Sequence, residues 1–326
     1  MDFQKRMLST SRNYIFEEEG YYVWCGTMFR YCDSYYMIYS RWEQKLGFEA
    51  WVTDSRLCLA KTDSMLGKFT FVRELFQYSS SVTGERIVMH NPTVISWHGK
   101  YYLYYMINHG TGDWWEHRNH QRIGVAYAED PEGEWTLVPD PVIDISEEGI
   151  DSLMTSNPTA LVTEDDRILM VYKAVSKYGE LPRGGKVLCG VAEADHPCGP
   201  FRKHGKPVME NPENPWSVED PFIWRENGRY YALVKDFHGY FTGTQGKAVA
   251  LFTSENGRDW ACAEQPLAFL PQLDFGDEVV KVENLERPQL YIEDGKSCLL
   301  LCACRDAVHR DKTFHIRIPL REDGEE

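Results

Sequence analysis

Two short acidic stretches, each ending in a proline, contain the residues of this sequence that are best suited to chemistry. Glu219 and Asp220 directly precede one proline, and Glu286 stands two residues before another. If Asp220 and Glu286 face one pocket, they have the groups needed to cleave a glycosidic bond, because that reaction uses one carboxylic acid and one carboxylate. A second carboxylate nearby also raises the pKa of an acid and helps to keep it protonated near neutral pH. The alternative is that these acids cap strand ends or pair with Arg287.

A hairpin pattern that occurs five times along the chain favours the shared pocket. Each copy has an anchor residue at the start of an apolar strand, a turn residue eight positions later and a returning apolar strand. The anchors follow one another at intervals of 66, 66, 63 and 67 residues and are Cys25, Asn91, Asn157, Asp220 and Arg287. A tandem duplication of hairpins is the simplest explanation, and a closed ring is its usual consequence.

Each hairpin is followed by a weaker pair of strands, within residues 56–72, 122–138, 187–204 and 248–263. The fifth unit has only one further strand after Arg305, so we expect residues 13–17 to supply its fourth strand. Four antiparallel strands make up one propeller blade. The sequence therefore predicts an all-β fold, a five-bladed β-propeller with four antiparallel strands per blade, in one domain spanning residues 1–326.

The ends of the returning strands should lie at the same rim as the anchors, because the two strands of a hairpin start and finish side by side. Several of these ends are cationic, which would suit a uronate, sulfate or phosphate group on a substrate. The alternative is that the cations neutralise the acidic anchors. The residues that we expect to bind substrate are Glu219, Asn91, Asn157, Arg287, Arg41, Trp42, His109, Lys173, Lys235, Asp236 and Arg305.

Residues 106–121, which include His109, interrupt the strand pattern. Long loops on a rigid scaffold are where specificity often lies, although a surface loop with solvated histidines would read the same way. Four tryptophans that we expect to be exposed are candidates for stacking on sugar rings, although tryptophan is more often simply packed: Trp24, Trp42, Trp114 and Trp115.

The composition limits the partners. The net charge of −15 argues against nucleic acid or an anionic membrane surface. No apolar run approaches the roughly 20 residues of a membrane span, and the first residues lack the apolar core of a secretory signal. The nine scattered cysteines, without a CxxC pair, indicate reduced thiols in a cytoplasm rather than disulfides or a zinc site. We expect no cofactor, and the sequence does not indicate an oligomeric state.

The hairpins EDPFIW…YYALV, ERPQLY…LLLC and NPTVI…YYLYY resemble those of the five-bladed β-propeller glycoside hydrolases, especially families 43 and 117. The resemblance covers most of the chain. It implies an oligosaccharide substrate, an Asp general base, an Asp that positions substrate and tunes pKa values, and a Glu general acid, usually acting with inversion. Asp220 matches the positioning Asp and Glu286 matches the acid. Relatives also sometimes hold a structural calcium ion in the central channel.

The general base is where this sequence departs from the pattern. The expected position is Asn91, whose amide cannot accept a proton from water, and the first anchor is a cysteine. The candidate replacements are Asp113, Asp151, Asp236 and Glu219. Three functions therefore remain open: a hydrolase that removes a terminal sugar, a phosphorylase of the family 130 type that needs no base, and a carbohydrate-binding propeller without catalysis.

Overall fold

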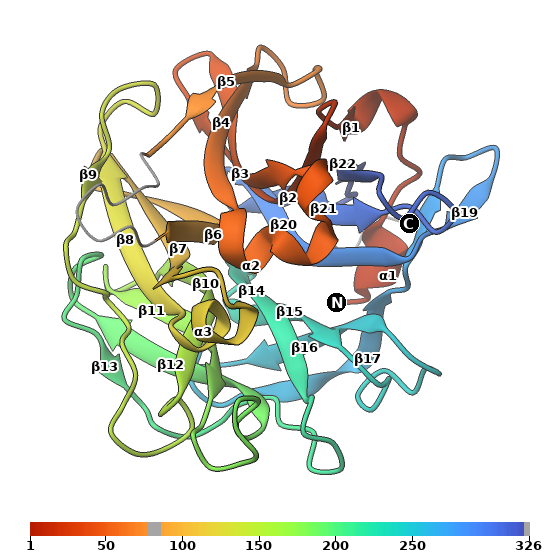
Figure 1. Cartoon of the computed structure of the whole chain (residues 1–326). Coiled ribbons are helices and arrows are strands. Elements are labelled where there is room, and N and C mark those ends of the chain that lie inside the picture. Colours follow the sequence, from red (N-terminus) through yellow and green to blue (C-terminus); the bar gives the residue numbers. More distant parts are fainter. Residues whose placement is uncertain (77–85, 323–326) are drawn as a thin grey trace.

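In the computed structural model, which describes residues 1–76 and 86–322, five sheets of four antiparallel strands surround one axis (Figure 1). The predicted all-β, five-bladed propeller is confirmed. The first two blades consist of β2 (Tyr21–Tyr31), β3 (Ser34–Glu43), β4 (Arg56–Thr62) and β5 (Thr70–Glu74), and of β6 (Arg86–Trp97), β7 (Lys100–Gly110), β8 (Arg122–Ala128) and β9 (Thr136–Leu137). The third and fourth consist of β10 (Met154–Val162), β11 (Ile168–Val175), β12 (Val187–Ala194) and β13 (Arg202–Lys203), and of β14 (Val218–Glu226), β15 (Arg229–Asp236), β16 (Ala248–Ser254) and β17 (Ala261–Phe269).

The fifth blade joins the two ends of the chain. Its strands are β20 (Asn284–Glu293), β21 (Lys296–Arg305), β22 (Thr313–Pro319) and β1 (Ile15–Phe16). The last of these pairs antiparallel with β22, with Ile15 opposite Ile316 and Phe16 opposite His315. The N-terminal segment thus closes the ring, as the missing strand of the fifth repeat predicted.

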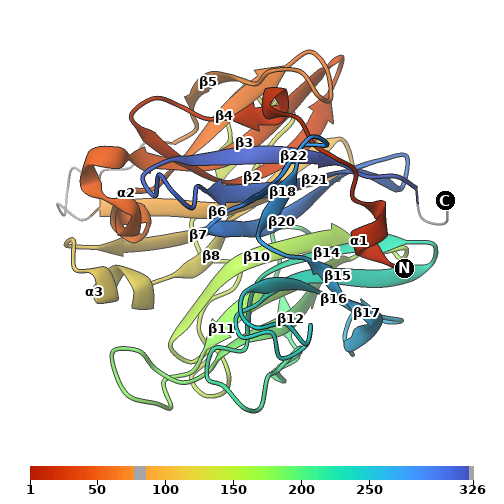
Figure 2. The ribbon, with the colours of Figure 1, turned by 90° about the vertical axis from the view of Figure 1, so that its right-hand side faces the viewer.

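A few short elements lie outside the blades. They are the hairpin of β18 (Gln272–Asp274) and β19 (Val279–Lys281), the α-helices α1 (Phe3–Arg6), α2 (Trp51–Asp54) and α3 (Trp114–Asn119), and the 3₁₀ turns η1 (Arg12–Tyr14), η2 (Gln44–Leu46) and η3 (Phe48–Ala50). Helices α2 and α3 project from one face of the propeller, while both chain ends lie toward the other (Figure 2). Among the described residues, no helix is long and apolar enough to cross a membrane.

The five anchors share an unusual backbone conformation. Each has a positive φ: 53° at Cys25, 54° at Asn91, 47° at Asn157, 57° at Asp220 and 54° at Arg287. Each also lies where the register between the first two strands of its blade shifts. Such a bulge turns a side chain out of the strand's alternation, at a cost for any residue other than glycine. The strained backbone at each anchor therefore directs the five anchor side chains toward the axis of the propeller.

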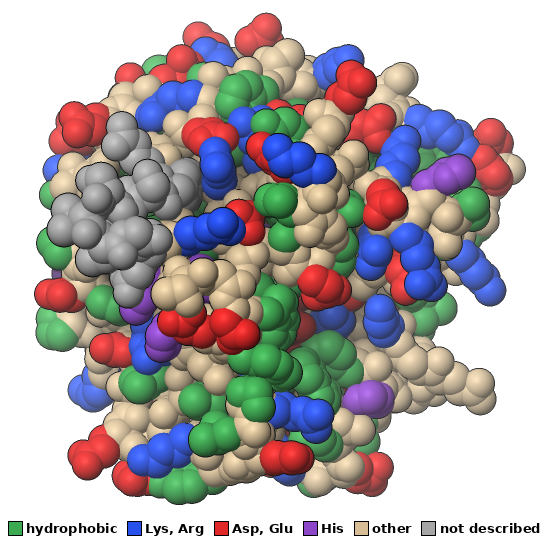
Figure 3. Space-filling model, in the orientation of Figure 1, with side chains coloured by type: hydrophobic (Ala, Val, Ile, Leu, Met, Phe, Trp, Pro, Cys, Tyr) green, Lys and Arg blue, Asp and Glu red, His purple; other side chains and the backbone are tan. Residues whose placement is uncertain are grey.

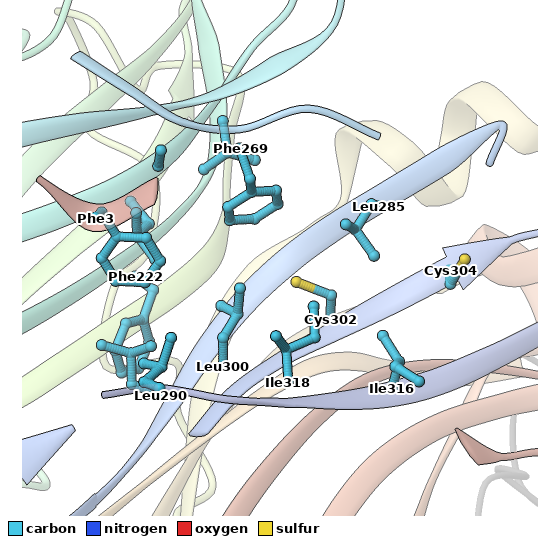
Figure 4. Close-up of a cluster of buried hydrophobic side chains, with 14 of the residues drawn as sticks. Phe3, Phe222, Phe269, Leu285, Leu290, Leu300, Cys302, Cys304, Ile316 and Ile318 are labelled. Atoms are coloured by element: carbon cyan, nitrogen blue, oxygen red, sulfur yellow. The ribbon is translucent and has the colours of Figure 1, made fainter. Parts of the chain in front are cut away.

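Apolar side chains pack between neighbouring blades. One cluster between the fourth and fifth blades contains Phe222, Phe269, Leu285, Leu300 and Ile316 and is covered from outside by Phe3 of α1 (Figure 4). These side chains are at most 7% exposed. This packing holds the first strand of each blade rigidly, which fixes the positions of the anchors.

Candidate functional site

The anchors meet at a pocket of about 220 Å³ on the face that carries α2 and α3. In Figure 3, which views this face, hydrophobic and charged side chains surround a hollow near the centre. The aromatic side chains of the pocket are Trp24, Trp42, Phe48 and Trp51. Its polar side chains are Glu49, Glu219, Asp220, Glu286, Lys235, Arg287, His90, Asn91, Asn157 and Asn284. A pocket that combines carboxylates with aromatic rings suits a sugar.

The anchor side chains form a hydrogen-bonded ring. The Cys25 thiol donates to the Asn91 Oδ1 atom at 2.8 Å, and the Asn91 amide donates to Asn157 Oδ1 at 2.5 Å. The Asn157 amide donates in turn to Asp220 Oδ1 at 2.7 Å, and Arg287 Nη1 reaches the same oxygen at 3.1 Å. The hydrogen bonds thus run from each anchor to the next as far as Asp220. Asp220 Oδ1 accepts from Asn157 on one side and from Arg287 on the other.

Two lysines neutralise the glutamates around this ring. Lys173 bonds to Glu219, and Lys235 Nζ lies 2.8 Å from Glu286 Oε1 and 3.8 Å from Glu219 Oε2. Asn284 also donates to the Glu286 oxygen that Lys235 binds. Glu219 and Glu286 therefore share the ammonium group of Lys235, and each of these carboxylates has a cationic partner.

The electrostatics separate the carboxylic acids. Burial acts to raise the pKa of Glu219, but Lys173 and Lys235 outweigh it and lower this pKa to about 2. Burial and the adjacent Glu219 raise the pKa of Asp220 to about 6, against the opposing effects of Arg287 and Lys235. Of these two neighbours, Asp220 is the one that can hold a proton near neutral pH. Glu219 stays ionised.

A neutral histidine forms part of the wall. The Nδ1 atom of His90 lies 2.7 Å from the Ser55 hydroxyl, and its ring tilts against Trp51 with centroids 5.1 Å apart. Burial, and secondarily Arg287, lowers the pKa of His90 well below its usual value. His90 can therefore donate or accept one hydrogen bond without adding charge to the pocket.

The predicted substrate-binding residues divide into three groups by position. Those that line the pocket are Glu219, Asn91, Asn157, Arg287, Trp42 and Lys235. Lys173 and Arg305 stand behind the wall: the first contacts Glu219, and the second places its guanidinium 4.2 Å from the ring centre of Phe48. Those that lie elsewhere are Arg41, His109 and Asp236.

Arg41 and Asp236 turn away from the pocket for simple reasons of strand geometry. Each is next to a residue that lines the pocket, Trp42 and Lys235, and neighbouring side chains of a strand point to opposite faces. Arg41 pairs with Glu18 at 3.0 Å and with Glu74 at 3.2 Å. Asp236 accepts backbone N–H groups of residues 240–242 and so organises that loop.

The long stretch at 106–121 folds differently from the expected loop. Strand β7 continues to Gly110, and α3 follows, capped by Asp113. His109 stacks on His120 with ring centres 4.8 Å apart, outside the pocket. Trp24 and Trp42, expected to be exposed, are 6% and 2% exposed, while Trp115 is 37% exposed.

The candidate replacements for the general base mostly lie outside the pocket. Asp113 accepts from the backbone of Glu116, and Asp151 is bound by Lys203 at 2.7 Å and by the Tyr172 hydroxyl at 3.0 Å. Of the four candidates, Glu219 alone lines the pocket. Its two lysines fix it as a carboxylate.

Sequence reasoning missed five pocket residues: Phe48, Glu49, Trp51, His90 and Asn284. The first three belong to the segment GFEAWVTD in the connection between β3 and β4, whose sequence does not repeat in the corresponding connections of the other blades. An acidic residue between two aromatic ones in an unrepeated segment was the signal available. His90 and Asn284 flank anchors, and nothing in their spacing distinguishes them.

The anchor ring does not suit the calcium ion that the resemblance allows. Calcium takes six to eight oxygen ligands. Here the Arg287 guanidinium donates into the ring, and a thiol takes the place of one oxygen. Within the described part of the chain, no group of three or more His, Cys, Asp or Glu residues could hold a metal ion.

Comparisons with known proteins agree on the architecture. No protein-family model matches this sequence, and no curated protein does. Among solved structures, a family 117 glycoside hydrolase from Zobellia galactanivorans superposes with a TM-score of 0.66 at 19% identity, over 98% of this chain and 91% of the other. This chain therefore has the fold of the five-bladed glycoside hydrolases. The resemblance in the hairpin motifs is thereby confirmed at the level of the fold.

Two further structures extend this likeness. A thermostable family 43 glycoside hydrolase has a TM-score of 0.66 at 13% identity, over 98% of this chain and 95% of the other. An exo-1,5-alpha-L-arabinanase from a bovine ruminal metagenomic library has a TM-score of 0.61 at 15% identity, over 94% and 100%. At these identities the likeness concerns the fold, and the activity has to be argued from the pocket.

Proposed function

We propose that this protein is a glycoside hydrolase that removes a terminal sugar from an oligosaccharide. One observation carries the proposal: Glu219, Asp220 and Glu286 line one pocket together with three tryptophans, where the five blades converge. A pocket of about 220 Å³ with the anchor ring at its floor accommodates a chain end better than a chain interior. The family 117, family 43 and exo-arabinanase folds support the same class of substrate.

The carboxylates have different roles in this proposal. Glu286, whose Oε1 atom lies 2.8 Å from Lys235 Nζ, takes a proton from an attacking water molecule. Asp220 is fixed by Asn157 and Arg287 and positions the sugar. The resemblance gives Glu286 the role of acid instead, which would require substrate to displace Lys235. The resemblance also supports inversion at the anomeric carbon. NMR observation of the anomer that forms first tests this stereochemical outcome.

An acidic group on the substrate is supported by a residue other than those expected. Lys173, Lys235 and Arg41 all have carboxylate partners. Arg118 of α3 is 5% exposed, and the bonds that the structure gives it go to the neutral Asn119 and to the Arg183 carbonyl. Burial lowers the pKa of Arg118 to about 10, although Glu219 opposes this effect. Arg118 does not line the pocket itself, and no ion pair is seen between it and Glu219. A uronate or sulfate that extends from the pocket toward α3 would give Arg118 a direct ionic partner.

The location and partners follow from the same considerations. All nine cysteines are free, which supports a reducing compartment such as the cytoplasm. The net charge of −15 supports an oligosaccharide rather than nucleic acid or a membrane as the partner.

The test is turnover of a panel of neutral and acidic glycosides, with and without inorganic phosphate. We expect hydrolysis without phosphate and a preference for acidic sugars. Asp220→Asn and Glu286→Gln should each reduce kcat/KM by roughly 10²–10⁴-fold, the usual effect of losing a positioned acid or base. Phosphate-dependent turnover would instead establish a phosphorylase. Sugar binding by a wild type that cleaves nothing would establish a binding propeller.

A further inference from the structure

The pocket contains a fourth carboxylate, Glu49, which comes from outside the repeated hairpins. It lies in η3, within the segment that joins β3 to β4 in the first blade, and lines the pocket together with Phe48 and Trp51. Glu219 and Glu286 come from the fourth and fifth blades. The connection between β3 and β4 thus adds a carboxylate from the first blade.

Glu49 differs from the other pocket carboxylates in its partners. Glu219 and Glu286 are bound by lysines, and Asp220 is bound by Arg287. Within residues 1–76 and 86–322, no hydrogen bond or ion pair involves the Glu49 side chain, which is exposed. The Glu49 carboxyl therefore has no cationic partner among the described residues and is open to a substrate.

The backbone on both sides of Glu49 is nevertheless well anchored. The ring of Phe48 packs against Tyr22, Trp24 and Trp42 at centroid distances of 5.5, 5.3 and 5.7 Å. Trp51 rests on His90 and meets the edge of Trp114 of α3 at 6.4 Å. Rigid flanks of this kind place a carboxylate at a fixed position on the rim while leaving its end free.

We propose that Glu49 is the general acid of the proposed glycosidase, a role that rests on that function. The protonated carboxyl of Glu49 gives its proton to the glycosidic oxygen as the bond from that oxygen to the anomeric carbon breaks. Water attacks the anomeric carbon and loses a proton to the Glu286 carboxylate. The products are two sugars with free hydroxyl groups, and solvent returns the proton from Glu286 to Glu49.

The positions of the two groups fit these roles. A terminal sugar that enters the pocket leads with its free end, so the bond to be cleaved and the leaving sugar lie toward the mouth. Glu49 is exposed at that mouth, whereas Glu286 is 9% exposed beside the anchor ring. The acid must reach the leaving oxygen, and the base must reach water on the opposite side of the sugar.

The experiment compares Glu49→Gln with Glu286→Gln on glycosides of one sugar whose leaving groups range from a nitrophenol to an alkyl alcohol. A good leaving group needs little protonation. Glu49→Gln should therefore lower kcat/KM by roughly 10²–10⁴-fold for the alkyl glycoside and less than about tenfold for the nitrophenyl glycoside. Glu286→Gln should lower both by similar factors, since every substrate needs the activated water.

Glu43→Gln is the matched control, because Glu43 precedes the connection between β3 and β4, pairs with Lys45 and does not line the pocket. It should leave both rates unchanged, and the unfolding midpoint of Glu49→Gln should equal that of the wild type. Equal losses of Glu49→Gln on both substrates, or no loss, would overturn the role of Glu49 while the hydrolase assignment stands. A wild type that cleaves no glycoside would overturn the proposed function itself.

Discussion

Asp220 is held in an electrostatic conflict, since it accepts hydrogen bonds from Asn157 and Arg287 but is buried next to ionised Glu219. Burial and Glu219 raise its pKa from 3.8 to about 6. The native state therefore binds a proton more tightly than the unfolded chain does. The stability associated with protonated Asp220 is fully present below about pH 4 and is lost as pH rises through about 6.

Asp220→Asn should remove this dependence, because asparagine imitates the protonated acid in shape and carries no charge. The free energy of unfolding of the variant, minus that of the wild type, should increase between pH 4 and pH 7. The full effect is about 3 kcal/mol for a shift of roughly two pKa units. Urea denaturation at a series of pH values measures it. Glu219→Gln should also weaken the dependence between pH 4 and pH 7, because Glu219 contributes to the raised pKa of Asp220. The stability that ionised Glu219 itself contributes is present above about pH 4 and is lost as pH falls through about 2. If the free energy of unfolding of Asp220→Asn minus that of the wild type stays constant or falls as pH rises, the electrostatic conflict at Asp220 is contradicted.

At the level of single elements, the sequence revealed the features that repeat and concealed those that occur once. Proline follows four of the five anchors, a turn residue at a constant offset marks every hairpin, and the strand missing from the fifth repeat located β1. Glu49 could not be found in this way, because the sequence of the segment that contains it does not repeat in the other blades. Arg41 was misplaced because a one-residue difference along a strand decides which face a side chain takes.

Strand β1 gives the clearest test at this scale, because two residues close the whole ring. Phe16 is 6% exposed and packs edge-on against Tyr39 at 5.0 Å and Phe69 at 6.1 Å, which belong to the first blade. Phe16→Ala should lower the free energy of unfolding by about 3–4 kcal/mol, the usual cost of emptying such a site. Phe71→Ala, at a position 43% exposed, should cost less than about 1 kcal/mol. Equal costs in urea denaturation would mean that β1 is not needed to hold the first and fifth blades together.

At the scale of the whole molecule, the anchor ring is a polar feature to which all five blades contribute. Its hydrogen bonds run in one direction from Cys25 through Asn91 and Asn157 to Asp220, and Arg287 completes it from the other side. Asn91 accepts with its oxygen and donates with its nitrogen, so each amide orientation depends on the next. The amide at the position expected for a general base therefore has a structural role in this chain.

Asn91→Asp tests whether that position lacks a base or completes the ring. An aspartate would place an oxygen against Asn157 Oδ1, and rotation of the Asn157 amide would then remove the bond to Asp220. A buried group left without its partner costs about 1–3 kcal/mol, and a charged one costs more. We expect Asn91→Asp to unfold at lower urea concentration and to hydrolyse no faster than the wild type. Cys25→Ser, which retains a donor to Asn91, should change stability less. A stable Asn91→Asp variant with higher turnover would show instead that the pocket had only lost its base, and that Glu49 and Glu286 are not the complete proton-transfer pair.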